Sequence, residues 1–227
     1  DAGPALLGPM SSVAQQEAKR VLDKLGVKIT LNMAVKDYVN DTVILNDGTE
    51  IKSKTLIWTS GVIARELPGI PAEKITRGRR VLVDEFNAVQ GYDNVYAVGD
   101  ICLQTSDPAY PNGHPQLAQV AIQQAQLLTK NIKAKDAGQS QKPFSYWDKG
   151  SMAVIARYNA VADLPKFSFT GFFAWMTWLL IHLVPIAGFR NKYKLLGNWT
   201  WSFYSGNSPL RLIVRSERKR EKQTNGN

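Results

Sequence analysis

Residues 94–124 read NVYAVGDICLQTSDPAYPNGHPQLAQVAIQQ, and this stretch decides the fold. The apolar run at 95–98 predicts a short strand that ends at Gly99 and Asp100. A loop rich in proline, asparagine and glycine follows, and His114-Pro115-Gln116 begins a helix that we expect to reach residue 133. The order strand, turn, helix is typical of an α/β sheet, in which ligands bind at the carboxyl ends of the strands.

The Gly99-Asp100 turn is the first candidate binding site. The glycine lets a ligand approach the backbone, and the aspartate places a carboxylate at the carboxyl end of the predicted strand. The helix that follows supplies unpaired N–H groups and a positive dipole end. Together these groups could hold the hydroxyls and the ring edge of a flavin. The alternative is a strand, a tight turn and a helix that hold no ligand, because Gly-Asp pairs are common in turns.

The chain before this stretch alternates helix and strand signals. Ser11 can cap a helix that runs to about residue 25, where Gly26 stops it. Strand-like runs follow at 27–31, 34–39, 42–45 and 51–58. The turn residues 46–48 predict a hairpin, and the last run ends in Thr59-Ser60-Gly61. This order predicts the second half of an α/β nucleotide-binding unit with an inserted hairpin.

Further elements flank the opening stretch. Residues 81–83 predict a short strand, and residues 135–142 read as a linker. Residues 152–157 and 159–162 predict a pair of short strands.

The charge is unevenly distributed. The 227-residue chain carries a net charge of +9; residues 1–141 are neutral, with 15 basic and 15 acidic residues, whereas residues 142–227 hold 13 and 4. A basic, aromatic C-terminal part suggests nucleic acid or an anionic membrane surface as partner. The single cysteine, Cys102, excludes an internal disulfide and an all-cysteine metal site, and it suits a reducing compartment.

The apolar content of the C-terminal part favours the membrane. Residues 167–189 carry no formal charge, and this run is long enough for a membrane span of ~20 residues. Polar residues and Pro185 interrupt it, however. Basic residues and a second aromatic cluster follow, with Arg211 and Arg215 after them. We therefore expect an interfacial helix pair on a lipid bilayer and no nucleic acid, with a buried core helix as the alternative. The expected membrane-facing residues are Phe169, Phe172, Phe173, Trp175, Met176, Leu179, Leu180, Leu183, Arg190, Lys192, Lys194, Trp199 and Trp201. Residues 216–227 predict a solvated, disordered basic tail.

Several sequence signals are missing from the chain. No GxGxxG occurs, although a dinucleotide site normally has this turn at its first strand–helix junction. The chain begins at Asp1 without a methionine or a secretory signal, so we expect it to be the C-terminal part of a longer protein. There is no metal-ligand cluster, and His114 and His182 lie far apart, so both are interpreted as structural histidines.

Several motifs resemble one family, the type II NADH dehydrogenases, which are single-subunit, non-proton-pumping NADH:quinone oxidoreductases. The resemblance covers nearly the whole chain. AQVAIQQ at 118–124 is its most specific element, while VYAVGD at 95–100 is shared with the wider disulfide-reductase-like flavoproteins. The other matching segments are DAGPALLGPM at 1–10, TLIWTSGV at 55–62, KGSMA at 149–153, AVADL at 160–164 and GFRNK at 188–192.

The resemblance implies an α/β fold that is the C-terminal part of a flavoprotein with two Rossmann-like dinucleotide-binding domains, one for FAD and one for NADH, plus a membrane-associating helical segment. It assigns residues 1–67 to the C-terminal half of the NADH-binding domain, 68–141 to that of the FAD-binding domain, and 142–227 to a membrane-binding domain with a basic tail.

The resemblance also implies roles for individual residues. Asp100, after Gly99, would accept hydrogen bonds from the flavin ribityl chain, and Lys149 would lie near the flavin ring. Ser60 and Gly61 would lie where the nicotinamide and flavin domains meet. The residues expected against the ring are Ala118, Gln119, Val120, Ala121, Ile122 and Gln123, of which Gln119 and Gln123 would hydrogen-bond the quinone carbonyls.

The implied activity is electron transfer from NADH through FAD to a membrane quinone. The parent would be a peripheral, monotopic protein on the cytoplasmic face of a bacterial plasma membrane, with a homodimer as a plausible state. We expect this chain alone to be inactive, because the Gly-rich half-sites are absent from it. Two alternatives stay open: a soluble flavin reductase for a protein acceptor, and a non-enzymatic membrane-surface adaptor.

Overall fold

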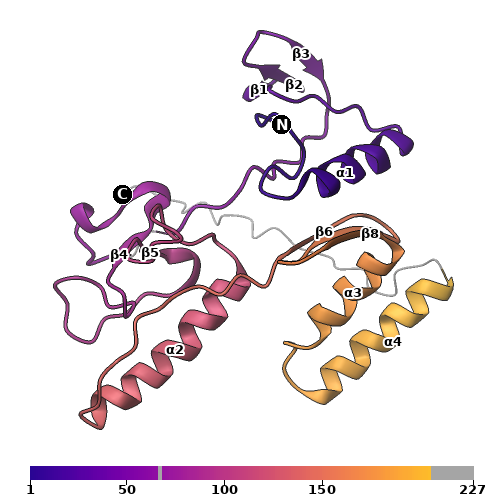
Figure 1. The fold of residues 1–227 in the computed structure, drawn as a ribbon. Helices are drawn as coiled ribbons and strands as arrows, with labels where there is room; N and C mark the ends of the chain where they lie inside the picture. Colours follow the sequence, from indigo (N-terminus) through magenta and orange to yellow (C-terminus); the bar gives the residue numbers. More distant parts are fainter. Residues whose placement is uncertain (66–67, 206–227) are drawn as a thin grey trace, which may run out of the picture. The chain divides into compact units, whose positions relative to one another are not determined.

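The computed structural model describes residues 1–65 and 68–205, which divide into two compact units. One unit combines Asp1–Ala34 with the described part of Gly150–Asn227, and the other is Val35–Lys149 (Figure 1). The division into three domains with bounds at residues 67 and 141 stays a prediction, because compactness alone assigns no nucleotide to either unit. The predicted basic tail at 216–227, with Arg211 and Arg215 before it, lies outside the described residues.

The first unit is a small antiparallel sheet with helices on both faces. Alternate residues of a strand point to opposite faces, so Ala160 and Ala162 pack with Ala174 of a helix on one face while Val161 lies on the other. All three β7 residues are buried, because α1 and α3 cover the two faces (Figure 1). The elements are α1 (Ser12–Lys24), β6 (Ser151–Ala156), β7 (Asn159–Asp163), β8 (Ser168–Gly171), α3 (Phe172–Leu183) and α4 (Phe189–Ser205), in strand order β6-β7-β8.

The start of α1 is fixed to this sheet by one carboxylate. Ser11 caps the helix, because its Oγ accepts a hydrogen bond from the Ala14 N–H at 3.3 Å. Asp163, at the end of β7, accepts the Ser11 N–H at 2.6 Å and the Ser11 hydroxyl at 2.7 Å. Two residues that lie 152 positions apart in the sequence therefore set where the helix begins.

The second unit contains two sheets and one long helix. The first sheet is the predicted hairpin with a flanking strand, in antiparallel order β1-β2-β3. The second sheet is a parallel pair, whose buried Val81, Val83 and Cys102 form a core cluster with Val89 and Ala97. The elements are β1 (Val35–Val39), β2 (Thr42–Leu45), β3 (Glu50–Lys52), β4 (Val81–Val83), β5 (Cys102–Gln104), α2 (Ala118–Asp136) and the 3₁₀ turns η1 (Ala72–Lys74), η2 (Arg77–Arg79) and η3 (Gly99–Ile101).

The α/β class and most elements were predicted correctly, but three predicted strands were wrong. Residues 27–31 form no strand, because this part of the chain bonds to the N-terminus: the Asp1 ammonium donates to the Thr30 carbonyl at 2.8 Å. The predicted strand at 51–58 stops at Lys52, and Ile57 and Trp58 are 80% and 62% exposed, because no strand among the described residues pairs with them.

The predicted strand at 95–98 is replaced by a looser arrangement. Its backbone bonds go to a turn, with the Val89 N–H donating to the Val95 carbonyl at 2.8 Å and the Ala97 N–H to the Asn87 carbonyl at 3.0 Å. The regular strand of this region is β5, which begins after Asp100 rather than before Gly99.

The boundaries of the helix in the opening stretch also differ from the prediction. Helix α2 begins at Ala118 rather than His114, because His114 is held in the core and Leu117 is extended, with φ −128° and ψ 144°. It continues to Asp136, so the predicted linker at 135–142 is helical over its first two residues. The paired strands near residues 152 and 160 are confirmed as β6 and β7, and β8 adds a third strand that the sequence analysis missed.

Candidate functional site

The Gly99-Asp100 turn packs directly against the first turns of α2. Gly99 has φ +74°, and a Cβ added there would lie 3.1 Å from the Cβ of Ala121. A side chain at residue 99 would therefore be strained both by its backbone conformation and by contact with the helix. Small residues are needed at positions 99 and 121 because the turn and the helix approach each other so closely.

Two glutamines of the opening stretch hold this turn. The buried Gln124 accepts the Gly99 N–H on its Oε1 at 2.7 Å, and Gln116 donates from its Nε2 to the Asp100 carbonyl at 3.0 Å. Neither residue was assigned a role from the sequence. Gln124 lies on the buried face of α2, four residues after the buried Val120 and seven before the buried Asn131. This helical spacing is the signal that could have identified it.

The carboxylate of the turn is left to solvent. Asp100 is exposed, and no hydrogen bond from the described part of the chain reaches its carboxylate. The adjacent N-terminus of α2 has no side-chain cap, because Leu117 occupies the capping position. A carboxylate acceptor and an uncapped helix N-terminus therefore lie next to each other, which suits a ligand that carries both hydroxyl donors and a negatively polarised edge.

The residues predicted along the start of α2 differ in exposure. Val120 is buried and cannot contact a ligand directly, whereas Ala118 and Ile122 are exposed. Gln119, Ala121 and Gln123 are partly buried.

Gln123 and Lys149 are brought together through Trp147. The Gln123 side-chain amide donates to the Trp147 carbonyl at 3.0 Å and accepts the Trp147 N–H at 3.1 Å. Trp147 is left 69% exposed, and the Lys149 Nζ lies 5.3 Å from the centroid of its ring, within cation–π range. The segment before Lys149 is thus anchored to α2, and its lysine and indole face solvent together.

Ser60 and Gly61 are not brought into this arrangement. Both are exposed and outside regular secondary structure, and Gly61 has φ +107°. Within residues 1–65 and 68–205, no hydrogen bond or ion pair joins them to the Gly99-Asp100 turn or to α2.

A buried His–Asp pair supports the loop before α2. The His114 Nε2 lies 3.0 Å from the Asp107 Oδ2, and both side chains are almost fully buried. The prediction that His114 is structural agrees with this position, but the pairing with Asp107 was missed, although both residues lie in one loop. Burial raises the pKa of Asp107, yet hydrogen bonds from His114, the Tyr146 N–H and the Ala109 N–H outweigh it and lower the pKa overall.

Aromatic rings enclose this pair. The centroids of Tyr110 and Phe144 lie 5.1 Å from that of His114, and the centroid of Tyr146 lies 6.0 Å away. Burial raises the pKa of Tyr146, so its hydroxyl stays protonated. The rings exclude water from the base of the loop, which therefore presents α2 from a rigid support.

Arg80 is a second residue that the sequence analysis missed. Its Nε donates to the Cys102 carbonyl at 2.7 Å and its Nη2 to the His114 carbonyl at 3.0 Å, so one guanidinium joins β5 to the loop before α2. Gly113 closes the same corner, where it has φ +89° and an added Cβ would collide with Leu103.

Cys102 is part of the core, and its buried position does not suit a redox-active thiol. Its Sγ lies 3.5 Å from the Gln124 Oε1, and burial raises the pKa of the thiol. The reactive form of a cysteine is the thiolate, which burial disfavours here. Among the described residues, no group of histidine, cysteine and acidic side chains could hold a metal ion.

The predicted membrane-facing residues lie on the last strand and on the helix pair. Phe169 and Trp175 pack against the alanine cluster of the sheet, so they are partly committed to the core. Phe172, Phe173, Met176, Leu180, Lys194 and Trp201 are exposed, as is Arg190, while Leu179, Leu183, Lys192 and Trp199 are partly exposed. The helix pair itself was predicted correctly. No helix in the described part of the chain is both long and apolar enough to cross a bilayer.

Two family models match the chain. Residues 1–125 match the pyridine nucleotide-disulphide oxidoreductase family, and residues 148–207 match the NDH2 C-terminal domain. The two matches together include the Gly99-Asp100 turn, the start of α2 and the helix pair.

Curated relatives agree with both models. The chain is 40% identical to the type II NADH:quinone oxidoreductase Ndh of Mycobacterium tuberculosis over 90% of its length and 45% of that protein's. It is 39% identical to NdhA of the same organism, over 89% of its length and 44% of NdhA's. The chain therefore spans less than half the length of these relatives.

A solved structure shares the fold. The NDH2 structure from Plasmodium falciparum in complex with NADH aligns with a TM-score of 0.80 at 18% identity, over 92% of this chain and 58% of that one. This likeness confirms the expected α/β oxidoreductase fold.

Proposed function

Since the chain belongs to the pyridine nucleotide-disulphide oxidoreductase family, and within it to the type II NADH dehydrogenases, we propose that its full-length protein passes electrons from NADH through FAD to a membrane quinone. The observation that carries this proposal is the Gly99-Asp100 turn against the uncapped N-terminus of α2.

The residues of this turn fit FAD. The exposed Asp100 carboxylate would accept hydrogen bonds from the hydroxyls of the ribityl chain, and Gly99 lets this turn lie close against α2. The amide groups at the start of α2 would stabilise negative charge at the pyrimidine edge of the ring. When bound, FAD supplies the redox chemistry, because it accepts a hydride and passes electrons on.

The quinone would be held beside the same helix. Gln119 is our candidate hydrogen-bond donor to a quinone carbonyl. The Lys149 ammonium would stabilise negative charge that develops on the flavin ring. The contacts of Gln123 support a different role from the one first predicted for it, because both polar atoms of its amide already bond to Trp147. We propose that Gln123 acts by positioning Trp147 and Lys149. Ser60 and Gly61 would lie where the nicotinamide and flavin domains meet in the full-length protein.

The helix pair α3–α4 would place the flavin beside the bilayer, where a lipophilic quinone dissolves. Its exposed apolar side chains and the basic residues Arg190, Lys192 and Lys194 suit the surface of an anionic membrane. We place the protein as a peripheral, monotopic enzyme on the cytoplasmic face of a bacterial plasma membrane. A homodimer through part of the same apolar surface is compatible with this location.

The rival proposal of a soluble reductase for a protein acceptor is less well supported. A disulfide acceptor needs a reactive thiol in the enzyme, and the one cysteine that this chain contributes, Cys102, is buried with a raised pKa. The exposed aromatic and basic helix pair has no purpose in that scheme.

The test uses the full-length protein. We expect it to purify with a flavin absorbance band and to oxidise NADH only when quinone is present. Asp100→Asn should bind FAD more weakly, while Asp93→Asn, an exposed aspartate in a neighbouring turn, should not. A full-length protein without flavin, or one that reduces ferredoxin or a disulfide faster than quinone, would contradict the proposal.

A further inference from the structure

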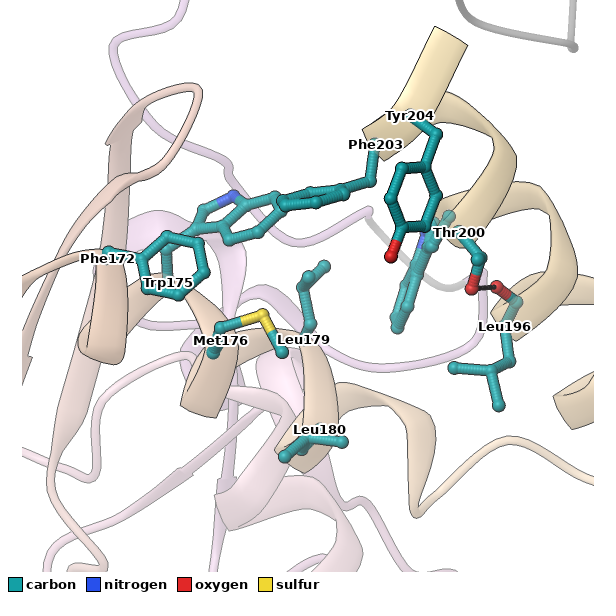
Figure 2. A pocket seen from close by; sticks show the side chains of 10 residues that line it. Phe172, Trp175, Met176, Leu179, Leu180, Leu196, Thr200, Phe203 and Tyr204 are labelled. Atoms are coloured by element: carbon teal, nitrogen blue, oxygen red, sulfur yellow. Dashed lines mark hydrogen bonds between the residues drawn. The ribbon is translucent and has the colours of Figure 1, made fainter. Parts of the chain in front are cut away.

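The C-terminal helix pair encloses a pocket of about 270 Å³. Figure 2 shows Met176, Leu179 and Leu180 of α3 on one side and Leu196 of α4 on the other. One end is closed by the rings of Trp175 and Phe203, which stack with their centroids 6.3 Å apart and an interplanar angle of 26°. The pocket is therefore a gap between two helices, lined by side chains of both.

The lining offers hydrocarbon contact and few hydrogen bonds. Thr200 is one of the few polar side chains in the wall, and its hydroxyl already donates to the Leu196 carbonyl at 2.9 Å (Figure 2). A polar head group inside the pocket would lose its hydration without a replacement partner. The occupant that suits this lining is an apolar chain.

The surface around the pocket continues the apolar character and adds positive charge. Phe173, Val184 and Phe189 are 76%, 71% and 79% exposed. Helix α4 holds three basic residues, Arg190, Lys192 and Lys194, and no acidic residue. An anionic head group would thus meet favourable charge on the same helix that lines the pocket.

We propose that this pocket holds one acyl chain of an anionic phospholipid, whose head group pairs with the basic residues of α4. The inference rests on the proposed membrane docking and deepens it. The pocket lies just below the range of roughly 300–1,000 Å³ that encloses whole drug-sized ligands, so it fits part of an extended chain better than a ring system. A second copy of this chain is a poorer occupant, because its Arg190, Lys192 and Lys194 would repel the same three residues of the first copy.

The occupancy can be measured with the 227-residue chain and vesicles of phosphatidylglycerol and phosphatidylcholine. A trace of phosphatidylglycerol carries a nitroxide on its acyl chain, and electron paramagnetic resonance separates motionally restricted lipid from fluid lipid. We expect one restricted phosphatidylglycerol per bound chain. Sedimentation with the vesicles reports docking independently.

A matched pair of variants isolates the pocket. Leu180 lines it and Ile181 does not, although the two neighbours on α3 are 55% and 48% exposed. Leu180→Trp should abolish the restricted signal while the protein still sediments with vesicles, and Ile181→Trp should leave both unchanged.

The remaining outcomes separate the two proposals. Sedimentation without any restricted lipid, or an equal signal in both variants, overturns the acyl-chain site and leaves membrane docking intact. Failure to sediment overturns both. Stoichiometric displacement of the labelled lipid by a long-tailed quinone assigns the pocket to the quinone tail instead, and loss of the signal on dimerisation assigns it to a second copy.

Discussion

The side-chain amide of Gln123 forms two hydrogen bonds with the backbone of Trp147, one as donor at 3.0 Å and one as acceptor at 3.1 Å. Asn131 makes the same pair of bonds with Lys142, at 2.8 and 2.9 Å, two turns further along α2. The segment between Lys142 and Trp147 is therefore held to one helix at both ends, although it forms no strand. Only the Gln123 end lies beside Lys149.

This symmetry gives a test of the role of Gln123. In the full-length protein, Gln123→Met removes both bonds and frees Trp147, so we expect kcat/KM for quinone to fall by about tenfold, equivalent to ~1.4 kcal/mol. Reduction of a soluble dye such as ferricyanide should change little. Asn131→Leu is the control, because it removes the equivalent bonds away from the site and should lower stability without selective loss of quinone reduction. Equal losses with quinone and dye in Gln123→Met would argue against the positioning role.

The Gly99 turn predicts a second effect. Gly99→Ala should destabilise the protein by about 1–2 kcal/mol from its left-handed backbone alone, with a further cost from contact with Ala121. Gly138→Ala is the matched control, because Gly138 has φ +67° and nothing lies within 4 Å of an added Cβ. The difference between the two variants in urea unfolding measures the contact with α2. We also expect only Gly99→Ala to lower FAD content, and an unchanged flavin-to-protein ratio would contradict the site.

Asp163 predicts a pH dependence of stability. Burial raises the pKa of this carboxyl, but the hydrogen bonds from Ser11 outweigh burial and lower the pKa in the folded state. The contribution to stability is therefore fully present above the unfolded value of about 3.9 and is lost as the pH falls through the lower folded value.

The experiment compares the free energy of unfolding of the wild type and Asp163→Asn between neutral and acid pH. At neutral pH the variant should lose about 0.5–2 kcal/mol, because the α1 cap is weakened. The difference should shrink as the pH falls from about 4 through the lower folded pKa, because the wild-type carboxyl then becomes protonated as well. A difference that stays constant across this range would show that the charge of Asp163 is not responsible.

Local signals in the sequence predicted the Gly99-Asp100 turn and the helix after it better than they predicted the strands around them. The Gly99-Asp100 turn and the helix after it follow from residue types whose conformational preferences act within a few positions. Strands depend on partners that are distant in sequence, so the apolar run at 51–58 was predicted to be one strand, although only its first two residues pair, with β2. The same limit hid β8, whose pairing with β7 was not visible in the pattern of its own residues.

The supporting side chains were missed for a related reason. Gln123 and Gln124 are adjacent in sequence, yet one bonds to Trp147 and the other is buried against Gly99. The two side chains differ only in the face of α2 on which they lie. Which face is buried can be told only once the neighbours of α2 are known. Arg80 and Asp107 likewise acquire their roles from carbonyl and imidazole groups brought near by folding.

The buried pair of Asp107 and His114 gives the last prediction. His114→Phe preserves a ring of similar shape among the aromatic side chains but leaves the Asp107 carboxylate without its imidazole partner, so we expect a loss of about 3 kcal/mol in urea unfolding. His182→Phe is the control, because His182 is exposed on α3 and should change stability by less than about 0.5 kcal/mol. Adding Asp107→Asn to His114→Phe removes the buried charge, and the double variant should be more stable than the two single losses predict when summed. Additive losses would mean that the two side chains contribute independently and that the charge on Asp107 does not depend on His114.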